Sequence, residues 1–170
     1  MEPLGYVRKM NLKPADVGGS ASGQLRISLP LIRDLDLDQV RIDAEARLQK
    51  TRIDKVVPGL DLSDGSARMH ITNDGLTARG DVRLNGVAAD LVWTESFTDS
   101  KRPSSRFELT GTLDDANRNA LGVDLSDFLT GRTAVKLVAT GRRGGISEAR
   151  VRADLTGAVE RALPRGADHR

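Results

Sequence analysis

Apolar and polar residues alternate with a period of two along most of this chain, and this pattern constrains the fold more than any other feature. Between positions 76 and 84, the even positions carry Leu, Ala, Gly, Val and Leu, while the odd positions carry Thr, Arg, Asp and Arg. Successive side chains of a β-strand point to opposite faces, so such a segment is typical of a strand with one apolar and one polar face. The sequence therefore predicts a mainly β protein, an antiparallel meander of about eight strands that forms a curved sheet or groove. The expected strands are residues 25–29, 40–48, 67–71, 76–84, 87–93, 107–113, 135–139 and 149–155.

Three turn sequences indicate that consecutive strands are antiparallel neighbours. Asn85-Gly86 is typical of a two-residue hairpin turn, whose central residues both need a positive φ. This turn places Leu84 opposite Val87 on one face and keeps the apolar positions of both strands in register. The other two turns are Asn73-Asp74-Gly75, which sets Ile71 opposite Leu76, and Gly144-Gly145, which sets Leu137 opposite Val151.

The same register also creates a like-charge contact. It places Asp81 directly opposite Asp90, which is unfavourable in a sheet. Arg79 and Arg83 lie on the diagonals of this pair. We expect them to offset the repulsion.

One segment interrupts the alternation. Residues 114–129 fit one or two short helical turns, with Asp114 or Asp115 as the cap and Gly122 as the end of the first turn. A helix this short is marginal alone, so it is expected to dock on the sheet. The chain then divides into an entry segment or linker (1–22), a β-rich domain (23–157) and a polar C-terminal tail (158–170).

Composition excludes several classes of protein. The net charge is only +2, without a run of one sign, and the aromatic residues are one Trp, one Tyr and three Phe. A nucleic-acid interface with base-stacking platforms is therefore not expected. The chain has no cysteine, which excludes disulfides and thiolate chemistry. No run of roughly 18 apolar residues is present to cross a membrane.

No pattern in the sequence predicts a catalytic or metal centre. Asp34, Asp36 and Asp38 have the spacing of a calcium loop, but Gln39 stands where that loop needs glycine, so solvated carboxylates are expected. The two histidines, His70 and His169, have no partners for a metal site or a catalytic triad. We therefore expect no enzyme activity, no metal and no cofactor.

The apolar face leaves two interpretations open. It is built mostly from Leu, Val, Ile, Ala and Gly, with few rings. A closed core would pack these side chains against a second layer. A groove for a long apolar ligand would instead use them as aliphatic walls in which small residues leave space. Composition does not distinguish a closed core from a groove.

Three stretches resemble a known family. They are Leu76–Trp93 (LTARGDVRLNGVAADLVW), Leu109–Ala116 (LTGTLDDA) continued by Ala120–Gly131 (ALGVDLSDFLTG), and Ala153–Ala158 (ADLTGA). With them, residues 23–157 resemble the AsmA-like proteins of Gram-negative envelopes, particularly the YhdP branch, which is related to TamB. This resemblance implies a long periplasmic β-sheet with an apolar groove, anchored in the inner membrane by a helix that this chain lacks. It also implies a part in phospholipid transport to the outer membrane and in the integrity of that membrane, with no catalytic residues.

On this basis the chain is expected to be an internal fragment of such a protein. Its partners would be phospholipid acyl chains and neighbouring β segments of the parent protein, and not nucleic acid. The alternative is a non-catalytic structural or protein-interaction module. The residues expected to face lipid are Val82, Leu84, Val87, Leu91, Trp93, Leu109, Leu137 and Val151.

Overall fold

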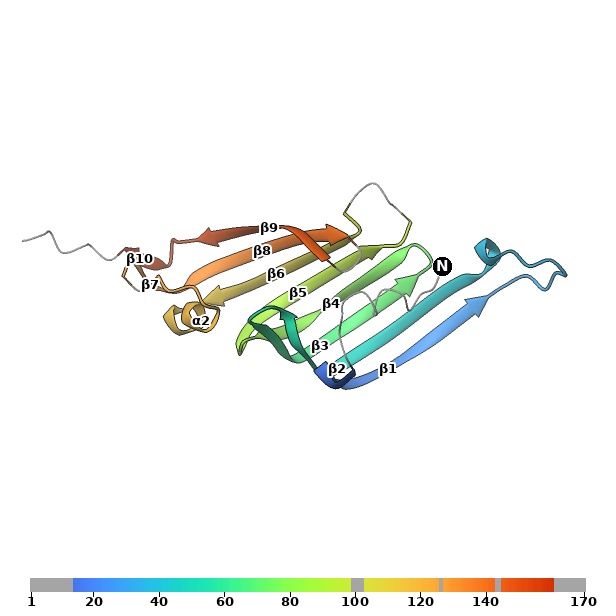
Figure 1. Cartoon of the computed structure of the whole chain (residues 1–170), viewed down its shortest axis with the longest axis horizontal. Coiled ribbons are helices and arrows are strands. Elements are labelled where there is room, and N and C mark those ends of the chain that lie inside the picture. Colours follow the sequence, from blue (N-terminus) through green and yellow to red (C-terminus); the bar gives the residue numbers. More distant parts are fainter. Residues whose placement is uncertain (1–13, 99–102, 126, 143–144, 161–170) are drawn as a thin grey trace, which may run out of the picture.

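The protein forms one open, curved antiparallel sheet of eight strands (Figure 1). A computed structural model describes residues 14–98, 103–125, 127–142 and 145–160. The strand order is β1-β2-β3-β4-β5-β6-β8-β9, so β1 and β9 are the two edges. The predicted fold class is confirmed. The strands are β1 (Val17–Ser28), β2 (Arg41–Val57), β3 (Leu60–Thr72), β4 (Gly75–Leu84), β5 (Val87–Ser96), β6 (Ser105–Leu113), β8 (Thr133–Arg142) and β9 (Gly145–Asp154).

Smaller elements lie at the ends of these strands. A second, two-stranded sheet pairs β7 (Leu129–Gly131) with β10 (Ala158–Glu160). The other short elements are the helix α2 (Asp115–Ala120) and the 3-10 turns η1 (Pro14–Asp16) and η2 (Leu37–Gln39).

The predicted hairpin registers are confirmed. Leu84 pairs with Val87 across the Asn85-Gly86 turn, where φ is 47° at Asn85 and 84° at Gly86. Both values lie in the left-handed region that this turn requires. The other two registers also hold, with Ile71 opposite Leu76 and Leu137 opposite Val151, although residues 143–144 of the last turn lie outside the described ranges.

The glycine-rich run that was expected to be a linker is part of β1. This strand begins at Val17 and pairs with β2 from the Val17–Ile53 pair onward. Gly19 takes a φ of 124° where the register shifts, and a Cβ on Gly23 would lie 2.4 Å from the carbonyl oxygen of Glu45. These glycines therefore permit a bulge and a close backbone approach, which other residues would obstruct.

β2 and β3 extend well beyond their predicted ends and form a long, irregular hairpin. The register shifts between Leu48 and Val57 of β2, and Lys50, Lys55 and Asp64 have positive φ. Each bulge adds a residue to one strand and reverses which face the following side chains reach. The simple alternation is therefore lost in the sequence although the strands continue.

The predicted helical insertion is confirmed as one short helix. Asp114 caps α2 by accepting a hydrogen bond from the Asn117 backbone, and the helix ends before Gly122, whose φ is 78°. The second predicted turn is only a single hydrogen-bonded turn, from the Leu129 amide to the Leu125 carbonyl, and β7 then begins. The expected polar tail likewise starts later than residue 158, because β10 occupies the first three residues of that tail.

No second layer covers the sheet in the part of the chain that the structure describes. The extensive contacts there join strands that are neighbours in a sheet, apart from α2 on β6 and η1 against β1 and β2. The buried apolar side chains in the described ranges are correspondingly few, namely Leu62, Ala78, Val82, Val87 and Ala139. The sheet is thus a single layer with two chemically different faces.

Candidate functional site

The apolar face is continuous across the whole sheet, because the registers of all seven strand pairings bring apolar residues into rows. Two rows run from β1 to β9 without a charged residue. One row is Gly23, Ala46, Met69, Ala78, Trp93, Phe107, Ala139 and Ala149. The next is Ala21, Leu48, Ala67, Gly80, Leu91, Leu109, Leu137 and Val151.

All eight residues expected to face lipid lie on this apolar face, but they differ in exposure. Leu91, Leu109 and Leu137 are half-buried neighbours in one row, and Val151 ends that row with 61% of its surface exposed. In contrast, Val82 and Val87 are 5% and 4% exposed. Among the eight residues, the row that runs from β5 to β9 is therefore accessible, whereas the two valines are packed.

Polar atoms without partners interrupt one end of the apolar face. Glu95 is 7% exposed and lies opposite Ser105, which is 1% exposed. Glu95 Oε1, Ser105 Oγ and the indole nitrogen of Trp93 are buried without a hydrogen bond. Trp93 also stacks on Phe107, with ring centroids 5.6 Å apart. Unsatisfied buried groups cost free energy, so this end of the face is a place where a bound polar group would be stabilised.

Ion pairs organise the polar face over β6, β8 and β9. Glu108 accepts from Arg106 Nε at 2.9 Å and contacts Lys136 Nζ at 2.8 Å, and Arg150 lies 2.8 Å from Glu148. Lys136, and then Arg106, hold the pKa of the Glu108 carboxyl below its usual value by hydrogen bonding to the ionised form. The Glu108 carboxylate therefore helps to stabilise the fold above its usual pKa, and this contribution is lost as the pH falls through the lowered value.

A Lys136→Met variant is expected to raise the pKa of Glu108 towards the usual value of 4.5, because the largest cause of the lowering is removed. Titration of the Glu108 side-chain carboxyl by NMR measures this directly. Lys136→Arg keeps the charge and serves as the control. An unchanged Glu108 pKa in Lys136→Met would contradict the assignment.

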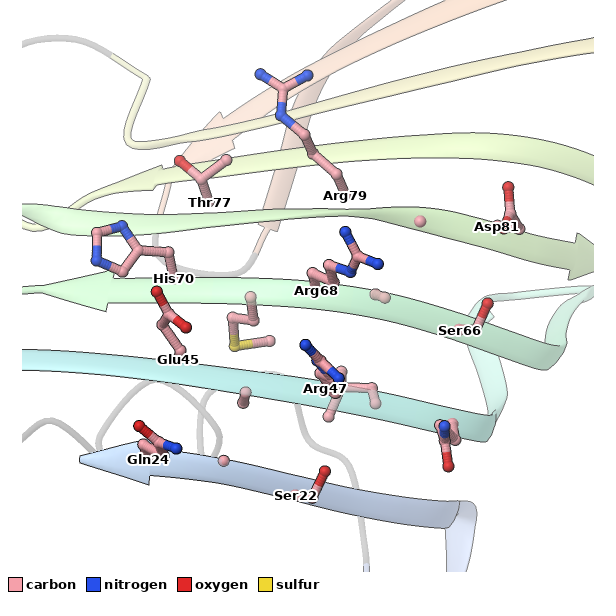
Figure 2. Close-up of a pocket in the computed structure, with 17 residues that line it drawn as sticks. Ser22, Gln24, Glu45, Arg47, Ser66, Arg68, His70, Thr77, Arg79 and Asp81 are labelled. Carbon is pink, nitrogen blue, oxygen red and sulfur yellow. The ribbon is translucent and has the colours of Figure 1, made fainter.

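A trough of about 1380 Å³ lies on the other part of the polar face, over β1 to β4 (Figure 2). Arg47, Arg68 and Arg79 occupy directly opposed positions on β2, β3 and β4, so they form one row along the trough, here called the arginine row. In Figure 2 the side chains of Arg68 and Arg79 lean in the same direction across the sheet, each towards the following strand. The other polar-face residues that line the trough are Ser22, Gln24, Glu45, Gln49, Ser66, His70, Thr77 and Asp81.

The arginine row was not predicted from the sequence. The sequence did predict one of its two pairs. The predicted Ile71–Leu76 pair places Arg68 opposite Arg79, which lie three residues from that pair on their strands. The position of Arg47 depends on the irregular hairpin between β2 and β3, whose register the alternation does not predict. Asp81 does lie opposite Asp90 as expected, and Arg83, on the diagonal of that pair, lies 3.9 Å from Asp64.

The remaining candidates for a site are the two histidines and the run from Asp34 to Asp38. His70 lies on the polar face, 3.4 Å from Asp43, and His169 lies outside the described residues. Within the described ranges, no three His, Asp or Glu side chains are grouped as metal ligands, Asp34–Asp38 included. No helix in those ranges has the length and apolar character needed to cross a membrane.

Comparison with known proteins identifies no relative. No protein-family model, no curated protein and no solved structure matches the chain.

Proposed function

We propose that this chain is a non-catalytic lipid-binding sheet, which holds acyl chains on its apolar face. The observation that carries the proposal is the row formed by Leu91, Leu109, Leu137 and Val151, which stays apolar across four strands and is not fully buried. Removing such surface from water is favourable by roughly 25 cal/mol per Å². An acyl chain laid along this row supplies the apolar surface that a second layer would supply in a sandwich.

The dimensions of the sheet support this proposal. Neighbouring strands are about 4.8 Å apart, so four strands present an apolar path of roughly 15 Å across the sheet. Small residues such as Gly80 and Gly111 lie beside the larger leucines and leave the surface uneven. A flexible hydrocarbon chain adapts to such a surface more readily than a rigid ligand does.

The resemblance to AsmA-like proteins suggests where this would take place. We place the chain within a longer periplasmic protein that is anchored in the inner membrane. There the sheet would form one section of an apolar path that carries phospholipid towards the outer membrane. The open edges at β1 and β9 would continue the path by pairing with neighbouring β segments of that protein.

A Leu91→Glu variant tests the proposal. The protein is expected to stay folded, because Leu91 is only half-buried, and to bind the fluorescent acyl probe cis-parinaric acid at least about tenfold more weakly. The matched control is Thr112→Glu, which adds the same charge at an exposed position of β6, on the polar face, and should bind the probe as the wild type does. Native mass spectrometry of the purified wild type should also detect co-purified phospholipid. Wild-type protein that binds neither probe nor phospholipid would overturn the proposal.

The second candidate function is a protein-interaction module, and the exposed edges favour it. Apart from Gly18, every residue of β1 is exposed, and so is every residue of β9 from Ile146 to Asp154. Unpaired edge strands are templates for pairing with another strand. This alternative predicts concentration-dependent association in sedimentation experiments together with no binding of the acyl probe.

A further inference from the structure

The arginine row places three like charges side by side on one face of the sheet, which is unusual. Arg47 is paired directly with Arg68, and Arg68 with Arg79, on three adjacent strands. Directly opposed side chains in a sheet have Cβ atoms only about 5 Å apart, and like charges at such positions repel each other. A protein whose polar face served only for solubility would be more stable with alternating charges here.

These three arginines lack the carboxylate partners that Arg106, Lys136 and Arg150 have on the same face. The described structure contains no ion pair and no hydrogen bond for the side chains of Arg47, Arg68 and Arg79. Elsewhere on the same face Arg106, Lys136 and Arg150 are each within 3 Å of a glutamate oxygen. The row Arg47-Arg68-Arg79 continues through Val92, Glu108 and Val138 to the paired Arg150, so the contrast occurs within one line across the sheet.

The surroundings of the arginine row favour an anion. The trough places Gln24, His70 and Thr77 on one side of the row and Ser66 on the other, and Ser22 continues the row onto β1. Its two carboxylates, Glu45 and Asp81, lie in the rows on either side and leave the centre positively charged. The volume of about 1380 Å³ exceeds that of a typical small-molecule pocket, so the trough can also hold the group that carries the anion.

We propose that the arginine row of the trough binds a phosphate group. Guanidinium groups present planar, forked N–H donors that match phosphate oxygens in pairs, and adjacent arginines about 5 Å apart can share one phosphate between them. The phosphate belongs either to a lipid headgroup or to a soluble phosphate compound. Because the trough is on the face opposite to the proposed acyl-chain site, the two proposals stand or fall separately.

The experiment uses the whole chain and two probes. Inorganic phosphate is titrated at constant ionic strength, with chloride as the reference salt, and the melting temperature is followed. Vesicles of phosphatidylcholine with and without phosphatidylglycerol are then used in co-sedimentation. The wild type is expected to be stabilised by phosphate beyond chloride, and the middle variant Arg68→Gln to weaken phosphate binding about tenfold.

The matched control is Arg150→Gln, which removes the same charge in the same row of the sheet, but at a residue paired with Glu148. It should bind both probes as the wild type does. In chloride alone, Arg68→Gln should be at least as stable as the wild type, because it relieves repulsion, so loss of binding is not explained by unfolding.

Each outcome is decisive. If the wild type binds free phosphate but not the vesicles, and Arg68→Gln loses this binding, the result supports the site with a soluble phosphate compound as its ligand. Binding that needs phosphatidylglycerol vesicles, lost in the same variant, supports the site with a lipid headgroup. The proposal would be overturned if the wild type preferred neither phosphate over chloride nor phosphatidylglycerol over phosphatidylcholine. It would also be overturned if Arg68→Gln and Arg150→Gln lost binding equally.

Discussion

A Gly80→Ala variant is expected to be less stable than the wild type by about 3 kcal/mol, although it adds only a methyl group. Gly80 pairs with Ala67 of β3, and a Cβ at this position would lie 1.8 Å from the carbonyl oxygen of Ser66. It would also lie 2.6 Å from Cα of Ala67. Both contacts are with backbone, so β3 and β4 must separate before the methyl group fits.

Urea denaturation followed by circular dichroism measures this loss. Gly18→Ala is the matched control, because a Cβ there would meet only Arg52 side-chain atoms, at 3.6 Å and beyond. Gly18→Ala should leave the free energy of unfolding within about 0.5 kcal/mol of the wild-type value or raise it slightly. A Gly80→Ala variant that loses less than about 1 kcal/mol would contradict the register of β3 and β4.

Loss of the Arg118 side chain is expected to be equally damaging, because this residue ties α2 to the ends of β6, β7 and β8. Arg118 is 4% exposed, and both of its terminal guanidinium nitrogens donate hydrogen bonds. Replacing it with alanine leaves one buried and several part-buried acceptors without a donor, at a cost of about 3 kcal/mol. Its partners are the carbonyl oxygens of Leu113, Leu129 and Gly131, the hydroxyl of Thr133 and the carboxylate of Asp115.

Hydrogen exchange locates the effect of this substitution. In Arg118→Ala the Gly131 amide, which donates to Asp115 at 3.1 Å, should lose its protection first, because the Asp115 carboxylate is no longer held in place. Asn119→Ala, at an exposed position of the same helix, should change the free energy of unfolding by less than about 0.5 kcal/mol. If the two variants are equally stable, Arg118 is not the residue that anchors the helix.

The period-two alternation and the turn residues were sufficient to predict the local structure. Each hairpin with a short turn, such as the one at Asn85-Gly86, had its register set by residues only a few positions apart. A one-residue slip would have moved every apolar side chain to the other face, so the pattern allowed a single answer. The cap at Asp114 and the end of α2 before Gly122 are similarly local. The apolar pairs across β3, β4 and β5, and those across β8 and β9, therefore follow from the sequence.

Tertiary structure decided the features that depend on distant or irregular backbone. The glycines of β1 indicated a linker until pairing with β2 showed that they allow a close strand approach. The bulges between β2 and β3 set which side chains meet across that hairpin, and hence that Arg47 joins Arg68 and Arg79. The sequence alone determined a sheet with one apolar and one polar face. Only the tertiary structure determined that no second layer covers it in the described ranges, because covering depends on contacts between elements far apart in the chain.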